Sequence, residues 1–569
     1  MSQAAPAAAE RLEQPEQRAW PGPAARVLWT VGALVLGCVV GLGGLSTPPP
    51  IPAGAEGFSA VRAAETARAL LGEAPRPVGS RANREAAERL RNWLVRLGLD
   101  TELQETEVRL AGRTIPIQNV LARRRGTLPG PAVLLMAHHD SVPASPGAGD
   151  DGMGVAVLGE VARGIAGGSW PGRDVILLFT DGEESGLLGA RHFSENHRWM
   201  REVGSVLNVD NRGRAGPCLI YETGPESADT LFAVAPRLRG AVANSFFAEV
   251  ARHMPNGSDF MVMRQAGKPG LNFAVIGDHA AYHAPEDSWD AIDLSSLQHQ
   301  GQTVITSLAG LAMLPVELER HSGDAVFLDL AGTVVAWWPT RTGIVLATAS
   351  MLLFPAIGWF GAGHRGGGRI GVPVGGIAST VRAITAALVC GGSLWALESA
   401  GVFGLDTVPD DVPAYQVHRA GFWPAAGPAM LAAAMIAGLG AAAIMSCRVP
   451  NRGDPLAQWC GAWGVVAALV LGMAVLAPGA SAPLLPVVLA AGVAAVLVSL
   501  RPRGLPWEPL LLVLPTLVAG ITLAPIEWLG WQGVGLSMPA FSAARCAVLA
   551  MILLAAMSTP QVRLNAATR

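Results

Sequence analysis

Long apolar runs occupy most of the chain after about residue 340, and they limit what it can fold into. Hydrophobic residues make up 51% of the 569 residues and charged residues only 15%, and the mean hydropathy is +0.37. These values exceed those of a soluble enzyme of this length. The chain must therefore contain a membrane-embedded portion.

The apolar runs predict eight membrane spans. The first lies at about residues 27–45 and is longer than the apolar core of a signal peptide, so we interpret it as a retained anchor. Seven further spans are expected at about 342–362, 379–400, 423–446, 459–477, 481–500, 508–525 and 541–558. The predicted organisation is a tail (1–25), an anchor (26–46), a polar domain (57–320), an all-α seven-span region (341–558) and a second tail (559–569).

Charges between the spans predict how the chain crosses the membrane, because cytoplasmic loops carry the excess of arginine. Arginines follow the second, fourth, sixth and eighth spans, at Arg365, Arg369, Arg448, Arg452, Arg501, Arg503, Arg563 and Arg569. The opposite loops carry acids, at Glu398, Asp406, Asp410, Asp411 and Glu527. This alternation predicts that both tails are cytoplasmic and that residues 57–320 lie outside. Because Lys268 is the single lysine among 41 basic residues, the composition suggests a GC-rich bacterial genome, and hence a periplasmic or extracellular domain on a bacterial inner or cell membrane.

Five short segments of the polar domain concentrate histidines and carboxylates. Taken singly, each has a plainer interpretation: a pair of glutamates after a strand often begins a helix, and Asp-Asp-Gly is a common turn. Zinc takes nitrogen and oxygen ligands, however, and a two-metal site needs about two ligands per ion and a bridging carboxylate. The segments hold His138 and Asp140, Asp150 and Asp151, Glu183 and Glu184, Asp210, and His283 and Asp287.

Three of these segments follow short apolar runs that are rich in strand-forming residues. The runs cover residues 132–136, 175–179 and 203–207. In an open α/β sheet, ligands at the carboxyl ends of strands converge on one crevice. The sequence therefore predicts an α/β domain in which the five segments form one metal site.

The order of these segments resembles that of zinc aminopeptidases of metallopeptidase family twenty-eight, and above all its membrane-bound endoplasmic-reticulum and vacuolar branch. Residues 76–80, the amphipathic stretch up to Gly98 and the segments 326–332 and 338–341 also resemble that branch. The resemblance covers about residues 57–345 and implies an aminopeptidase-type α/β/α sandwich with a mixed central sheet. It implies two Zn²⁺ per chain, with Asp150 bridging both ions. The implied ligands are His138, Asp150, Glu184, Asp210 and His283.

The remaining polar residues of the segments have expected roles in peptide hydrolysis. Glu183, next to the ligand Glu184, is the expected general base, which takes a proton from water and passes it to the leaving amine. Asp140 is expected to orient His138, because carboxylates behind a ligand fix its orientation. Asp287 is expected either to act likewise on His283 or to cap the local structure. Tyr282 is expected to pack, or else to hold the oxyanion.

Charge and cysteine content limit which partners and which alternative functions are expected. A net charge of −3 argues against nucleic acid, so the expected partners are a peptide substrate and the lipid bilayer. Cys218 is the single cysteine of the polar domain, which excludes a disulfide framework there. Two alternatives to the peptidase remain: a glutaminyl-cyclase-like acyltransferase with a single zinc, and a non-catalytic scaffold of the same fold.

Overall fold

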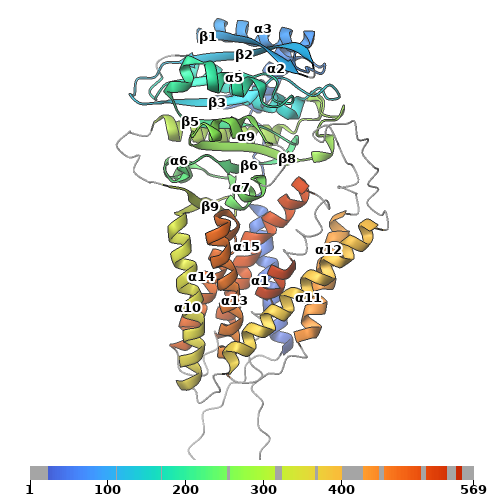
Figure 1. Cartoon of the computed structure of the whole chain (residues 1–569), viewed down its shortest axis with the longest axis vertical. Coiled ribbons are helices and arrows are strands. Elements are labelled where there is room, and N and C mark those ends of the chain that lie inside the picture. The colour runs from blue at the N-terminus through green and yellow to red at the C-terminus, as the bar shows by residue number, and fades with distance from the viewer. Residues whose placement is uncertain are drawn as a thin grey trace, which may run out of the picture.

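The structure is a computed structural model of the chain. It describes residues 23–110, 112–167, 170–252, 257–313, 323–364, 370–399, 427–446, 454–500, 508–534 and 546–553. Figure 1 shows a layered part built of strands and helices standing on a bundle of helices, with the long axis of the molecule running through both. Most of both predicted tails lies outside the described residues.

The layered part is built on an eight-stranded mixed sheet, with strand order β1-β2-β4-β3-β5-β8-β6-β7. Neighbours among β4, β3, β5 and β8 are parallel, so their carboxyl ends meet at one edge. The three apolar runs predicted as strands are β3, β4 and β5, which confirms them. The strands are β1 (Asp100–Leu110), β2 (Arg113–Arg124), β3 (Ala132–His138), β4 (Val175–Thr180), β5 (Val203–Val209), β6 (Ala215–Thr223), β7 (Val242–Ala243) and β8 (Gly270–Gly277).

Helices cover both faces of this sheet because the central strands are apolar on both faces. In β3, Val133 and Leu135 join one buried cluster, whereas Leu134 and Met136 join another on the opposite face. The first cluster includes α2 (Ala60–Leu71), α3 (Arg81–Arg96), α4 (Met153–Ala166), α6 (Ser227–Val234) and α9 (Leu294–Ala312). The second includes α5 (Leu188–Asn196) and α8 (Asp259–Gln265). The predicted α/β/α sandwich with a mixed sheet is confirmed.

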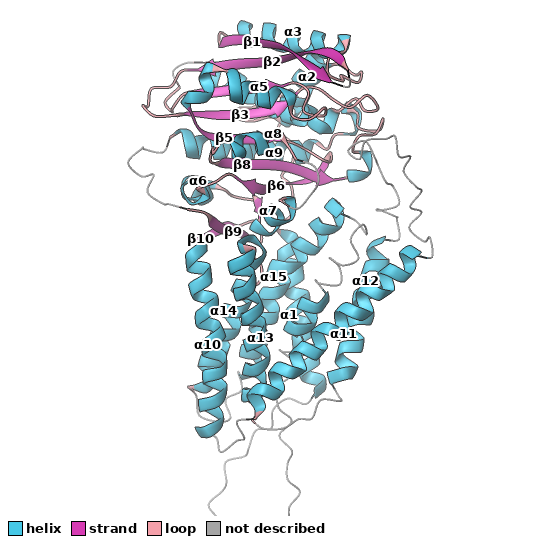
Figure 2. Ribbon diagram, viewed as in Figure 1, coloured by secondary structure: helices cyan, strands magenta, loops and turns pink. Residues whose placement is uncertain are grey.

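The lower part contains strongly apolar helices, and Figure 2 shows no strand within it among the described residues. Within the described ranges, four helices are long and apolar enough to cross a membrane: Thr340–Gly361, Gly371–Leu397, Leu456–Leu476 and Val513–Gln532. Shorter apolar helices cover Leu28–Gly43, Ala429–Ala442 and Leu485–Ser499. The full helices are α1 (Pro23–Gly43), α10 (Thr340–His364), α11 (Gly371–Ser399), α12 (Gly427–Ser446), α13 (Pro455–Leu476), α14 (Leu485–Ser499) and α15 (Glu508–Val534).

Each predicted span thus meets a helix, although the bounds differ. Helix α11 begins at Gly371, before the predicted start at 379, and α15 continues to Val534, past the predicted end at 525. Of the span predicted at 541–558, the described residues 546–553 are helical.

A two-stranded hairpin joins the two parts of the molecule. Strands β9 (Ala325–Leu330) and β10 (Val334–Pro339) pair antiparallel, and α10 begins directly after β10. Asp329 fixes the hairpin to the large sheet, because its carboxylate accepts the backbone N–H of Ala243 at 3.1 Å. The segments 326–332 and 338–341, which resemble the membrane-bound branch, thus lie in this hairpin and at the start of α10.

Candidate metal centre

The five predicted segments meet at the carboxyl ends of the parallel strands. His138 ends β3, and Asp210 directly follows β5. Glu183 and Glu184 lie in the turn after β4. The remaining two segments are loops: Asp150 lies in the turn η1 (Ala148–Gly152) before α4, and His283 lies in the loop after β8. The fold thus brings together residues that are far apart in the sequence.

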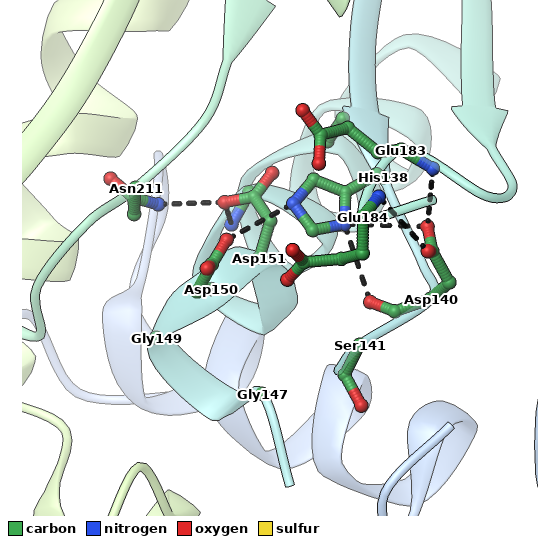
Figure 3. Close-up of polar contacts among 12 residues, drawn as sticks. His138, Asp140, Ser141, Gly147, Gly149, Asp150, Asp151, Glu183, Glu184 and Asn211 are labelled. Carbon is green, nitrogen blue, oxygen red and sulfur yellow. Dashed lines mark hydrogen bonds and ion pairs between the residues drawn. The ribbon is translucent and has the colours of Figure 1, made fainter. Parts of the chain in front are cut away.

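The carboxylate of Asp150 lies between two histidines. Its Oδ1 is 3.1 Å from Nε2 of His138, and its Oδ2 is 3.2 Å from Nε2 of His283. Nε2 of His283 is also 3.1 Å from Oε2 of Glu184. Figure 3 shows His138, Asp150 and Glu184 facing one another, and one ligand atom from each lies within 4.8 Å of the others. Asp150 therefore presents one oxygen to each side of the site.

Several acids of the site lie close together and are at least partly buried, which changes their pKa values. Burial raises the pKa of Glu184 to about 7, and the charge of Asp150 adds to this effect. Burial, together with the nearby charges of Asp150, Asp259 and Glu184, raises the pKa of Asp210 to about 8. Burial and the charge of Asp210 raise the pKa of Glu183 well above its ordinary value. The site therefore concentrates more negative charge than its own histidines balance.

Asp150 is the exception among these acids. Burial alone would raise its pKa, but hydrogen bonds with His138 and His283 outweigh burial and hold the pKa below its usual range. Burial opposes protonation of His283, but its bonds with Asp150 and Glu184 raise its pKa to about 10. The histidine nitrogens thus face a carboxylate that remains charged.

The site fits a divalent cation. Oε1 of Glu184 is buried and has no hydrogen-bond partner among the residues that the structure describes. A buried acceptor without a partner is costly unless a proton, a water or a metal ion satisfies it. Imidazole nitrogens and carboxylate oxygens are the donor set that zinc uses in catalytic sites.

Asp140 holds the Glu183–Glu184 turn against His138. Its Oδ1 accepts the backbone N–H of Glu183 at 3.1 Å, and its Oδ2 accepts that of Glu184 at 3.3 Å. Nδ1 of His138 lies 3.2 Å from the backbone oxygen of Asp140 and 3.5 Å from its Oδ1. Asp140 thus contacts the predicted base, Glu183, and two predicted ligands, Glu184 and His138.

Asp287 acts on the segment that carries Asp150. Its Oδ1 accepts the backbone N–H of Gly149 at 2.7 Å, and its Oδ2 accepts that of Asp150 at 3.2 Å. Tyr282 stacks on His283, with ring centroids 3.7 Å apart and planes 20° apart. The guanidinium of Arg212 also lies over the ring of Tyr282, with its Cζ 4.9 Å from the ring centroid.

Three polar residues around the site were given no role of their own from the sequence, although Asp151 lies in a predicted segment and Arg76 in a segment that resembles the family. Asp259 is buried and accepts the hydroxyl of Thr180 at 2.5 Å, next to the end of β3. Asp151 accepts a hydrogen bond from Asn211 at 2.8 Å. Arg76 is fully buried and donates to the backbone oxygens of His139, Pro146 and Gly147. Neither Ser258-Asp259 nor Asp151 stands out from an ordinary cap or turn in the sequence, because their roles depend on contacts between distant segments.

Part of this chain, including the five segments of the centre, matches a known peptidase family. Residues 119–308 match the family model "Peptidase family M28". Endoplasmic reticulum metallopeptidase 1 of Rattus norvegicus is 32% identical over 222 residues, which cover 38% of this chain and 25% of that protein. A vacuolar membrane protease of Candida dubliniensis is 36% identical over 242 residues, which cover 42% of this chain and 26% of that protein. The chain thus matches about a quarter of the length of these relatives.

Two solved structures share part of their fold with this chain. A glutaminyl cyclase of Porphyromonas gingivalis has 24% identity and a TM-score of 0.38, covering 45% of this chain and 100% of its own. A zinc aminopeptidase of Bacillus subtilis has 18% identity and a TM-score of 0.36, covering 49% of this chain and 98% of its own. On the match to the family model and to the named metallopeptidases, residues 119–308 are a domain of peptidase family M28.

Proposed function

We propose that the chain is a membrane-anchored di-zinc aminopeptidase that hydrolyses peptides outside the cytoplasm. The observation that carries the proposal is Asp150, whose two oxygens face His138 and His283 separately. A carboxylate in this arrangement suits a bridge between two metal ions, each held by its own histidine.

The contacts divide the expected ligands between two positions. Glu184 belongs with His283, because their side chains are 3.1 Å apart. We assign Asp210 to the position of His138, because burial raises the pKa of Asp210 and the charge of His138 is the interaction that most opposes this rise. One zinc would be held by His138, Asp150 and Asp210, and the other by Asp150, Glu184 and His283.

Bound zinc supplies a water of lowered pKa and polarises the scissile carbonyl. The residues of the chain transfer protons and fix the positions of the base and the ligands. The carboxylate of Glu183 takes the proton of the attacking water and passes it to the departing amine. Asp140 keeps that carboxylate in place through the backbone N–H of Glu183. Tyr282, stacked on His283, restricts the orientation of that ring.

The helix ends support the proposed orientation. The end of α1, the start of α10, the α13–α14 connection and the end of α15 all lie on the peptidase side, since Leu45, Trp338, Ala482 and Leu529 join clusters with residues of the layered part or its hairpin. The predicted arginine-rich junctions follow the opposite ends of α10, α12 and α14. By the rule that positive loops stay inside, the peptidase domain faces outward.

The experiment is a substrate panel with the purified, zinc-loaded full-length protein. Aminoacyl reporters with a free amino group should be hydrolysed, and their N-acetylated counterparts should not. Glu183→Gln should reduce turnover by about 10²- to 10⁴-fold or more, whereas Glu65→Gln, on the exposed face of α2, serves as a matched control. Cyclisation of amino-terminal glutamine without peptide hydrolysis would instead favour the single-zinc acyltransferase. No turnover of any substrate would favour the scaffold.

A further inference from the structure

The strand order places the metal centre at a defined distance from the membrane part. His138 lies on β3, and four strand spacings separate β3 from β7, the edge strand of the sheet. Figure 1 shows the strands stacked along the same long axis as the helices, with β6 and the hairpin next to the bundle. Because neighbouring strands are about 4.8 Å apart, the centre lies about 20 Å above this edge.

Contacts on the lower edge of the sheet hold the domain at this height. Leu529 of α15 is buried in a cluster with Leu219 of β6 and Val242 of β7. The turn after α13 contacts α7 (Ser245–Ala251), where Gly479 N donates to the carboxylate of Glu249 at 3.2 Å. No side chain fits at Gly479, because an added Cβ would lie 2.3 Å from the backbone oxygen of Ser245.

Two more contacts lie at the hairpin. Ala482, just before α14, is buried with Val326 and Leu328 of β9. The backbone after α1 approaches the hairpin so closely that a Cβ on Gly44 would lie 2.3 Å from the carbonyl carbon of Ala331. The peptidase domain is thus fixed to the ends of α1, α10, α13, α14 and α15, and not held by a single linker.

We infer that the fixed height of the metal centre sets a minimum tail length for membrane-tethered substrates, so that the domain works as a molecular ruler. The inference rests on the proposed aminopeptidase function. A polypeptide whose amino terminus projects from a membrane anchor reaches the centre only if its tail spans about 20 Å, which takes about six fully extended residues. Trimming from the amino terminus therefore stops with a stub of about six residues or more, whereas a soluble peptide has no such limit.

The test uses the zinc-loaded full-length protein in liposomes with a series of synthetic peptides. Each carries a free amino terminus, an uncharged tail of about three to fifteen residues and a carboxyl-terminal apolar helix of about twenty residues, long enough to span the bilayer. The matched control is the same tail without the helix. Mass spectrometry measures how many residues are removed.

Long anchored tails should shorten to one constant stub of about six or more residues, whatever their starting length, since each extended residue adds about 3.3 Å of reach. Anchored tails of about three residues should be hydrolysed at least tenfold more slowly than their soluble counterparts. Trimming of anchored tails down to one or two residues would overturn the ruler alone. Failure to hydrolyse even the soluble tails would overturn the proposed function, and the ruler with it.

Discussion

The carboxylate of Asp287 accepts the backbone N–H of Asp150 at 3.2 Å, across 137 positions of the sequence. It also accepts the N–H of Gly149 at 2.7 Å, so that both oxygens hold the turn that carries the proposed bridging ligand. The sequence left Asp287 open between a partner of His283 and a structural cap. Its contacts are those of a cap, and the capped turn carries Asp150 rather than His283.

Asp287→Ala should therefore weaken zinc binding about 10- to 100-fold, as the loss of groups that orient ligands does. Asp287→Asn should have a smaller effect, since one acceptor oxygen remains for one of the two N–H groups. Zinc affinity is measured by competition with a chelator. Asp290→Ala is the control, because this neighbouring carboxylate is 82% exposed and pairs with a surface arginine. Equal affinities for Asp287→Ala and the control would refute this role.

Asp140→Asn should weaken zinc binding by a similar factor of about 10 to 100 and leave the fold intact. An asparagine cannot accept both N–H groups of the Glu183–Glu184 turn, because its NH₂ would oppose one of them. The same chelator competition, together with an unchanged melting temperature, checks this prediction. Asp100→Asn, an exposed site at the start of β1, is the matched control. Unchanged zinc affinity in Asp140→Asn would remove Asp140 from the site.

Adjacent glutamates should give opposite phenotypes. Glu183→Gln should retain zinc but lose turnover by about 10²- to 10⁴-fold or more, because it removes the proton acceptor alone. Glu184→Gln should lose zinc, because it replaces a carboxylate that faces His283 at 3.1 Å. Metal analysis and turnover of both variants decide the roles. Exchanged phenotypes would mean that base and ligand are assigned the wrong way round.

Much of this site was predictable because its parts lie at strand ends. The apolar runs before His138, Glu183 and Asp210 gave strands whose parallel pairing alone brings the three segments to one edge. The partners of Asp259 and Asp287 were not predictable, since they lie on other loops and no periodic pattern encodes such contacts. Likewise, β7 is two residues long and depends on pairing with β6, which leaves no local signal.

Removing zinc should make stability depend strongly on pH. In the folded, metal-free site the pKa values of Glu184 and Asp210 are about 7 and about 8, above the ordinary values of about 4 in the unfolded chain. Ionising these acids therefore costs more in the folded state, and stability falls as pH rises from about 5 to about 8. His283, with a pKa of about 10 in the folded site and about 6.5 in the unfolded chain, adds in the same direction above about pH 6.5. The folded state binds this proton more tightly than the unfolded chain, and a rise in pH weakens that advantage.

Apparent melting temperatures of the detergent-solubilised protein, with zinc or with a chelator, check this dependence. The gap between the two should widen from about pH 5 to about pH 8, because zinc binding favours the deprotonated ligands. A gap that stays constant or narrows would show that these carboxylates do not titrate with metal release.

The number of zinc ions per chain tests the central claim most directly. The metal-free full-length protein is titrated with zinc, and bound metal and hydrolysis of an aminoacyl reporter are measured at each step. The account predicts saturation at two zinc ions per chain, and Asp150→Asn should reduce binding at both positions, because its oxygens face both histidines. Saturation at one zinc ion with full activity, or an Asp150→Asn variant that still binds two, would contradict it.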